Sequence, residues 1–144
     1  MIREIKFRGM SEGKWYYGLL TFMFGRYAIV DPKDENTVHL VDEKTIGQYT
    51  GRKDKIGNEI IEGNIVSWQD KEDIYSIEFG EFGVPNIEEQ GYQDWAIGYF
   101  LKPQHNLKEV EPFNMTIPLN KVYASEITVI GNIYDNPELL ESDK

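Results

Sequence analysis

The basic side chains that could contact a ligand are concentrated in one short segment, where Arg52, Lys53 and Lys55 surround Asp54. A basic turn near an aromatic residue such as Tyr49 is a pattern that nucleic-acid-binding surfaces use. Exposed turns also carry charge for solubility, and this alternative explains the same residues. Arg52, Lys53 and Lys55 are therefore candidate binding residues.

The longer segment 51–64 contains glycines and lysines close together, as a phosphate-binding loop does. It lacks the Gly-Lys-Ser/Thr ending, and no helical pattern follows that could direct an N-terminal dipole at a phosphate. Turn formation accounts for its glycines.

Catalytic and metal-binding patterns are weak. His39 and His105 are isolated, and neither has a carboxylate at a spacing typical of a metal site or an acid–base pair. The acidic clusters at 70–73 and 88–89 lack the alternation and distal glutamate of a calcium loop. There is no cysteine and no Gly-x-Ser-x-Gly sequence. The sequence thus predicts no catalytic residue, metal or cofactor, although an enzyme whose site assembles from distant residues stays open as an alternative.

Aromatic residues make up 13% of the chain and provide the last group of candidates. Aromatic side chains in strands usually lie in the core, so we expect most of them to be buried, among them Trp15, Tyr17, Trp68 and Trp95. Alternation along a strand places Tyr16 on the opposite face from Trp15 and Tyr17. Tyr16 is therefore the fourth candidate binding residue.

These residues must be positioned by strands. Strand patterns, alternating with period two or forming short apolar runs, recur in segments 5–8, 15–17, 27–30, 38–41, 60–61, 65–68, 75–79, 95–101 and 127–130. We expect a loop or bulge over residues 80–91 and a long irregular excursion over 103–118. Asn136 followed by Pro137 favours a short helical turn near the C-terminus.

Charge is distributed unevenly over a chain of 144 residues with a net charge of −10. Residues 1–56 hold 10 Lys/Arg and 8 Asp/Glu, a net of +2, whereas residues 57–144 hold 5 and 17, a net of −12. Such a chain repels nucleic acid over most of its surface, and only the N-terminal third leaves a local exception. The acidic part could also imitate DNA and occupy a host DNA-binding protein.

No segment predicts membrane insertion. The most apolar run, residues 15–24, is far shorter than the ~20 residues that span a bilayer. The charged N-terminal residues do not resemble a signal peptide. These features favour the cytoplasm.

Three blocks in order resemble the YopX family of small phage and prophage proteins. The first block, residues 3–9, reads Arg-Glu-Ile-Lys-Phe-Arg-Gly and has Trp15 and Gly18 downstream. The second covers residues 45–66 and contains Gly-Arg-Lys-Asp-Lys-Ile-Gly, and the third covers residues 130–140. The resemblance implies a mostly β protein of mobile-element origin, with an SH3-type barrel in its C-terminal part. Asn64 departs from the family pattern, which usually has an aspartate there, and this argues against an essential carboxylate at that position.

The fold we expect is mostly β, with an N-terminal β portion over residues 1–56 packed with an SH3-like barrel portion over residues 57–144. The leading functional hypothesis is a non-enzymatic phage or prophage accessory protein that binds another phage or host protein. Nucleic-acid binding through the basic N-terminal third is the alternative, followed by an enzyme of unknown class. Exposed strand edges also favour self-association into a homo-oligomer.

Overall fold

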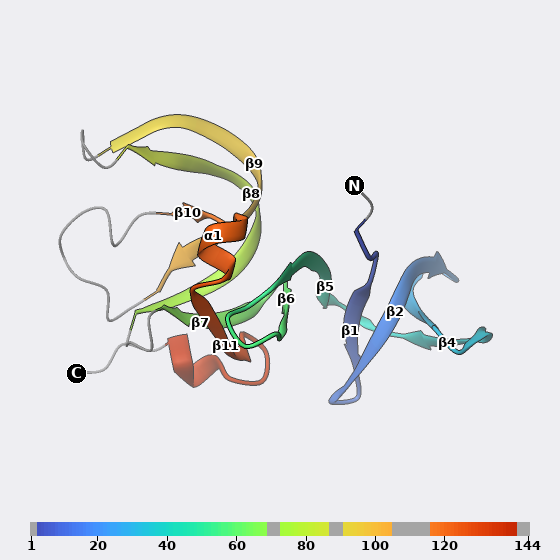
Figure 1. Cartoon of the computed structure of the whole chain (residues 1–144). Coiled ribbons are helices and arrows are strands. Elements are labelled where there is room, and N and C mark those ends of the chain that lie inside the picture. The colour runs from blue at the N-terminus through green and yellow to red at the C-terminus, as the bar shows by residue number, and fades with distance from the viewer. Residues whose placement is uncertain (1–2, 69–72, 87–90, 105–115, 141–144) are drawn as a thin grey trace. The chain divides into compact units, whose positions relative to one another are not determined.

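The computed structural model describes residues 3–68, 73–86, 91–104 and 116–140, without the side chains of 85, 86 and 91–93. The chain divides into two units, Met1–Gly51 and Arg52–Lys144. Its strands form two antiparallel sheets, in the orders β4-β3-β2-β1-β5-β6 and β10-β9-β8-β7-β11 (Figure 1). The predicted mostly β fold is confirmed. The unit boundary follows Gly51, whereas the sequence analysis places it after residue 56.

The first unit is made of antiparallel strands that follow one another closely. They are β1 (Phe7–Ser11), β2 (Lys14–Met23), β3 (Arg26–Asp31), β4 (Asp34–Leu40) and β5 (Asp42–Lys53), whose last residues belong to the second unit. Two-residue turns, Glu12-Gly13 and Phe24-Gly25, join the first three strands, and all four turn residues have positive φ. Positive φ at both positions defines the type I′ turn, whose twist matches that of a β-hairpin.

Strand β2 changes its partner at Gly18. Its first half pairs with β1, ending at the pair Phe7 and Gly18, and its second half pairs with β3, beginning at Leu19 and Val30. A Cβ added to Gly18 would lie 2.1 Å from the carbonyl oxygen of Val30. Only glycine therefore allows β3 to approach β2 at this point.

The connection between β4 and β5 shows that the sheet of the first unit is strongly curled. Across the sheet of this unit, β4 is the first strand and β5 is the last. In the sequence, however, Val41 is the only residue between them. A flat arrangement of five strands would hold them ~19 Å apart, too far for one residue to span. Val41 lies against Gly9 of β1, where an added Cβ would be 2.7 Å from Cγ2 of Val41. The missing side chain of Gly9 thus makes room for Val41.

The second unit contains most of the remaining elements. They are β6 (Glu59–Ile61), β7 (Asn64–Trp68), β8 (Ile74–Asn86), β9 (Gly91–Pro103), β10 (Ile117–Pro118), α1 (Lys121–Ala124), β11 (Ile127–Asn132) and a 3-10 helix, η1 (Pro137–Leu140). Within the described residues, β10 and β11 are the end strands of an open five-stranded sheet. A closed SH3-like barrel is therefore not confirmed.

The core of the second unit is apolar and continuous. Its buried members come from β6, β7, β8, β9, β11, α1 and the residue after β10: Ile60, Val66, Tyr75, Ile77, Leu101, Leu119, Ala124 and Ile127. Tyr75 and Ile77 lie two residues apart on β8, as the period-two pattern predicts, but Ser76 between them is also buried, and so are the first four residues of β7. Trp68 is only half-buried and packs on the edge of this core.

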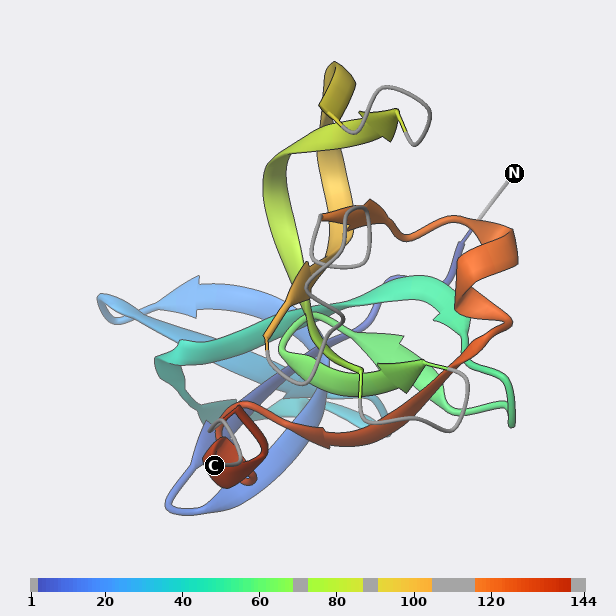
Figure 2. The ribbon, with the colours of Figure 1, turned by 90° about the vertical axis from the view of Figure 1, so that its left-hand side faces the viewer.

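The long hairpin of β8 and β9 corrects one prediction. The expected loop or bulge over residues 80–91 is only partly right, because β8 continues to Asn86 and β9 begins at Gly91, while the register of their ladder shifts between Val84 and Pro85, as at a bulge (Figure 2). Gly80 lies opposite Gly98, in the part of the ladder that precedes this shift. The ladder is made by backbone groups, so these glycines interrupt the hydrophobic pattern without interrupting the strands. Residues 105–115 of the expected excursion lie outside the described residues.

The predicted C-terminal helical turn is present as η1, which begins at Pro137. The side chain of Asn136 has a different role from the expected N-cap, since its Oδ1 accepts a hydrogen bond of 3.1 Å from the backbone N–H of Asn132. The side chain of Asn132 in turn accepts from the N–H groups of Tyr134 and Asp135, both at 2.9 Å. Amide side chains therefore organise the third of the sequence blocks.

Candidate functional site

The basic turn of the second unit is organised around a buried acidic residue. Lys53 and Lys55 are exposed and Arg52 is half-buried, whereas Asp54 is buried. Its Oδ1 accepts hydrogen bonds from the N–H groups of Ile56 (3.0 Å) and Asn58 (2.8 Å). The Asp54 carboxylate thus fixes the turn and is not part of the charged surface. Tyr16, the fourth candidate binding residue, belongs to the first unit. The four candidates predicted from sequence therefore do not lie within one unit.

In the first unit, Tyr16 lies in a stack of side chains that we call the stacked cluster: Lys14, Tyr16, Asp31 and His39. The rings of Tyr16 and His39 are 3.9 Å apart at 18°. Lys14 Nζ lies 5.5 Å from the centroid of the Tyr16 ring. His39 Nε2 lies 3.9 Å from Asp31 Oδ2, the distance of an ion pair when the histidine is protonated.

The curl of the sheet explains why these side chains meet. Tyr16 pairs with Gly9, over which Val41 lies. His39 precedes Val41 by two residues and therefore points to the same side of the chain. This placement corrects the sequence prediction: Tyr16 is half-buried under His39, and its neighbour Tyr17 is the more exposed residue, at 43%.

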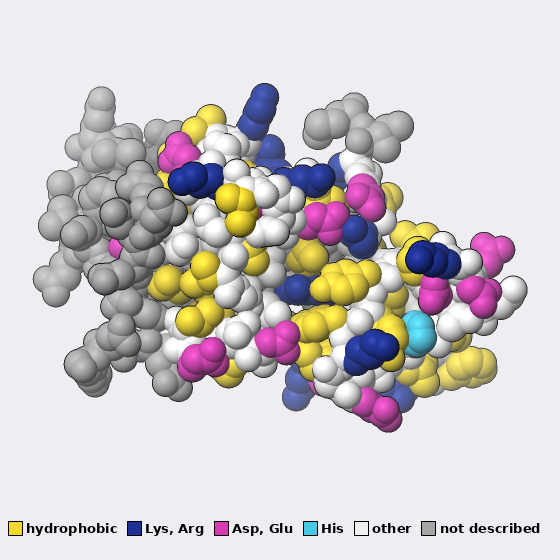
Figure 3. Space-filling model, turned by 60° about the horizontal axis from the view of Figure 1, so that its bottom comes forward, with side chains coloured by type: hydrophobic (Ala, Val, Ile, Leu, Met, Phe, Trp, Pro, Cys, Tyr) yellow, Lys and Arg dark blue, Asp and Glu magenta, His cyan; other side chains and the backbone are white. Residues whose placement is uncertain are grey.

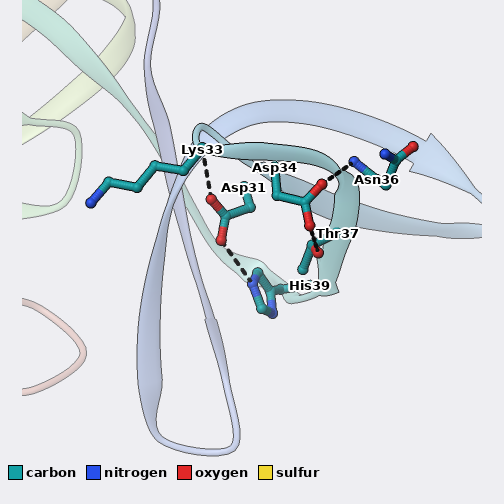
Figure 4. A network of polar contacts seen from close by, with 6 residues as sticks. All are labelled: Asp31, Lys33, Asp34, Asn36, Thr37 and His39. Atoms are coloured by element: carbon teal, nitrogen blue, oxygen red, sulfur yellow. Dashed lines mark hydrogen bonds and ion pairs between the residues drawn. The ribbon is translucent and has the colours of Figure 1, made fainter.

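Short polar contacts fix the turn that carries Asp31 (Figure 4). Asp31 Oδ1 accepts a hydrogen bond of 2.8 Å from the backbone N–H of Lys33. Asp34 accepts a hydrogen bond of 2.7 Å from the hydroxyl of Thr37 and one of 3.1 Å from the backbone N–H of Asn36. These two hydrogen bonds, chiefly the one from Thr37, lower the pKa of the Asp34 carboxyl below its usual value. The turn between β3 and β4 thus holds one face of Asp31 toward His39.

A shallow groove of about 310 Å³ lies beside the turn between β2 and β3, and we call it the hairpin groove. It is lined by Phe22, Gly25, Arg26, Tyr27, Val41, Asp42 and Glu43. The rings of Phe22 and Tyr27 meet edge to face at 5.0 Å. Figure 3 shows hydrophobic side chains reaching the surface beside charged ones. Neither His39 nor Asp31 lines this groove, so it is separate from the stacked cluster.

Phe24 is the most exposed large hydrophobic residue of the described part of the chain, at 92%, and Phe22 is 61% exposed. Phe24 also has a φ of 54°. Left-handed backbone conformations are unfavourable for a bulky residue, and the type I′ turn normally places Asn or Asp there. The sequence analysis did not select these aromatics, although Phe-Gly in place of Asn-Gly between two strand patterns is a readable signal.

Arg8 of β1 is the second residue that the sequence analysis missed. It is only 4% exposed, and its Nε and Nη2 atoms have no hydrogen-bond partner among the residues that the structure describes. The guanidinium lies over the Trp15 ring, with Cζ 4.5 Å from the centroid. A buried charge without a polar partner is costly, so this guanidinium is an unusual feature of the first unit.

The β8–β9 hairpin of the second unit presents three exposed apolar residues on one face: Phe79, Trp95 and Ile97. The expectation that Trp95 lies in the core is wrong, since 62% of it is exposed. Trp95 lies opposite Gly83, which offers no side chain for it to pack against.

Within the described ranges, no three His, Asp or Glu side chains are grouped so that they could hold a metal ion. His105, Glu88 and Glu89, and most of the 70–73 cluster, lie outside the described residues. No helix among the described residues is long and apolar enough to cross a bilayer.

The fold and surface define a mostly β protein of two units, the first carrying an aromatic hairpin turn. The family model described as YopX protein matches residues 7–141, and the chain therefore belongs to the YopX family. The crystal structure of protein EF1440 from Enterococcus faecalis is similar in fold, with a TM-score of 0.50 and 22% identity, over 97% of this chain and 100% of that chain. No curated protein matches the sequence.

Proposed function

We propose that this chain is a non-enzymatic phage or prophage accessory protein that binds another protein through the hairpin groove and the adjacent Phe24. We further propose that it acts in the cytoplasm of the bacterial host. Membership of the YopX family supports the mobile-element origin that its sequence blocks imply.

The observation that carries the proposal is the combination of exposure and backbone conformation at Phe24. A phenylalanine that is 92% exposed adds little to folding, and its φ of 54° costs stability. Exposed aromatic rings that fill a partner's pocket are typical anchors of protein interfaces. The ring at this turn is therefore better explained by binding than by folding.

The groove lining defines the chemistry of the partner. Phe22 and Tyr27 offer apolar surface, and Asp42 and Glu43 provide two exposed carboxylates against one cation, Arg26. Charge complementarity favours a protein segment with an apolar side chain flanked by Lys or Arg.

The test uses two matched turns of the same type. Phe24→Asn removes the ring and supplies the residue that a type I′ turn prefers, and Glu12→Asn makes the equivalent change in the other turn, where φ is 53°. The wild-type protein and both variants are used to capture proteins from host cells that carry the phage. Captured candidates are then purified, and their affinities are measured by calorimetry.

We expect a purified partner that binds the wild type and Glu12→Asn equally and binds Phe24→Asn at least tenfold more weakly. This loss corresponds to an anchor worth about 1.4 kcal/mol or more. Equal affinity for both variants would show that the hairpin groove is not the binding surface. Failure to find any partner with measurable affinity would count against the protein-binding function itself.

The SH3-like barrel stays part of this proposal as the description of the second unit, supported by the short strands β6 and β7, which two residues connect. Self-association is also proposed, through the β8–β9 hairpin, because Trp95 and Ile97 are exposed there.

A further inference from the structure

The guanidinium of Arg8 has two buried donors on one side without acceptors. Nε and Nη2 are the atoms that find no acceptor in the described part of the chain, and the whole residue is 4% exposed. These two nitrogens carry parallel N–H groups in a fixed fork. Removing a charged group from water without hydrogen bonds costs several kcal/mol, so an acceptor is expected at this position.

The Trp15 ring restricts where that acceptor can lie. It covers one face of the guanidinium at 4.5 Å from Cζ, in a cation–π arrangement. Because the ring covers a face of the guanidinium, a hydrogen-bond acceptor must approach in the plane of the guanidinium, at its edge. A planar group with two oxygens matches the Nε–Nη2 edge in a bidentate way, which neither chloride nor a single carbonyl oxygen does.

We propose that Arg8 and Trp15 form a binding site for a carboxylate group, held by two parallel hydrogen bonds to Nε and Nη2 of Arg8. The proposal does not depend on the hairpin groove or on its partner. A carboxylate fits better than a phosphate, because the single positive charge of Arg8 balances one negative charge, whereas a phosphate carries more than one. The carboxylate could come from a free small molecule or from a protein C-terminus, and the two sources share this chemistry.

The direct experiment observes the Arg8 side chain in the full chain by nuclear magnetic resonance. The sequence contains only four arginines, so the Nε–H signals of Arg8 and Arg26 can be assigned by comparison with Arg8→Lys and Arg26→Lys. The wild type is titrated with sodium acetate, with a C-terminal tetrapeptide of neutral side chains and blocked N-terminus, and with inorganic phosphate. Each titration is compared with sodium chloride at equal ionic strength.

We expect the Arg8 Nε–H signal to move in a saturable way with acetate, at millimolar concentrations, while the exposed Arg26 signal does not. A response to the tetrapeptide that saturates at least tenfold lower would identify a protein C-terminus as the source, and an equal or weaker response would identify a small carboxylate. Saturation by phosphate and not by acetate would overturn the carboxylate assignment. No saturable change with any anion would show that water satisfies the fork, and the proposal would be wrong.

Thermal unfolding of Arg8→Met gives an independent reading, with Arg26→Met as the matched control. In chloride, Arg8→Met should melt at the same temperature as the wild type or higher, because it removes an unpaired buried charge. In saturating acetate the wild type should gain stability and Arg8→Met should not, whereas Arg26→Met should follow the wild type. A wild type that gains nothing from acetate would contradict the site. Where Arg8→Met fails to fold, the titration of the wild type decides alone.

Discussion

The carboxylate of Asp54 accepts a hydrogen bond of 2.8 Å from the backbone N–H of Val129, 75 residues further along the chain. The backbone N–H of Lys55 also donates to the carbonyl of Ile127, at 2.9 Å. The charged turn of residues 51–58 is therefore attached to β11. These contacts join the second of the three sequence blocks to β11, the strand that leads into the third block. Part of the reason why both blocks are present is therefore that they pack against each other.

Replacing Asp54 should destabilise the second unit. Asp54→Ala leaves the N–H groups of Ile56, Asn58 and Val129 without their acceptor, and the expected loss in free energy of unfolding is about 2–3 kcal/mol. Urea denaturation followed by circular dichroism measures it. Asp34→Ala is the control, because its exposed carboxylate also accepts hydrogen bonds within a turn, and its loss should be clearly smaller. Equal losses would mean that burial of Asp54 contributes nothing.

The two type I′ turns should respond to substitution in the same direction. Phe24→Asn and Glu12→Asn each relieve a left-handed conformation that Asn adopts more readily, and each should stabilise the protein by about 1 kcal/mol. Differential scanning calorimetry of both variants tests the prediction. A destabilising effect confined to Phe24→Asn would show that the ring contributes to folding, which would weaken the case for a binding role.

Gly18 of β2 should tolerate no larger residue without a loss of stability. In Gly18→Ala the new Cβ meets the Val30 carbonyl oxygen at 2.1 Å, so the strands must separate, at a cost of about 3 kcal/mol. Gly80→Ala is the control, since its Cβ would meet only the Phe100 ring, at 3.9 Å, and its effect should be within about 0.5 kcal/mol. Chemical denaturation of the two variants compares them directly. A Gly18→Ala protein as stable as the wild type would contradict the close approach of β3.

Alkaline pH should destabilise the second unit through the ionisation of Tyr75. Burial raises the pKa of the Tyr75 hydroxyl above its ordinary value, with a smaller contribution from the charge of Asp73. Below about pH 10 both the folded and the unfolded states keep the proton, and stability is unaffected. Above it the unfolded state loses the proton first, so stability should fall by up to about 1.4 kcal/mol per pH unit.

The Tyr75→Phe variant should lack the loss of stability at alkaline pH that Tyr75 causes. The Tyr17→Phe variant, in which an exposed residue is changed, should still show it. Denaturant midpoints measured between pH 8 and pH 12 make the comparison. Parallel pH profiles for the wild type and Tyr75→Phe would rule out Tyr75 as the cause.

The two tryptophans of the second unit should differ in their contribution to stability. Trp68 packs against the core, and its Nε1 donates a hydrogen bond of 3.1 Å to Glu126. Because its ring is only half-buried, Trp68→Ala should cost about 3 kcal/mol, the lower end for a buried aromatic. Trp95→Ala should change stability by no more than about 0.5 kcal/mol. An unchanged denaturant midpoint in Trp68→Ala would reject its role in the core.

Several parts of the fold could be predicted from sequence because their causes are local. Alternation identified strands such as β11, where Ile127 is fully buried, and Pro137 located the start of the final helical turn. The hairpin of β8 and β9 was missed because its glycines break the side-chain pattern while the backbone ladder continues. Helix α1 was missed because its four residues are too few to show a helical period.

The sequence by itself determined the β class, the family and the candidate basic turn, because these depend on neighbouring residues. Only the tertiary structure decided which side chains meet. It placed His39 on Tyr16, turned Asp54 inward and buried Arg8 beside Trp15. The physical reason is that the curl of the first sheet depends on contacts such as Val41 against Gly9, which join residues distant in sequence and leave no periodic signal in it.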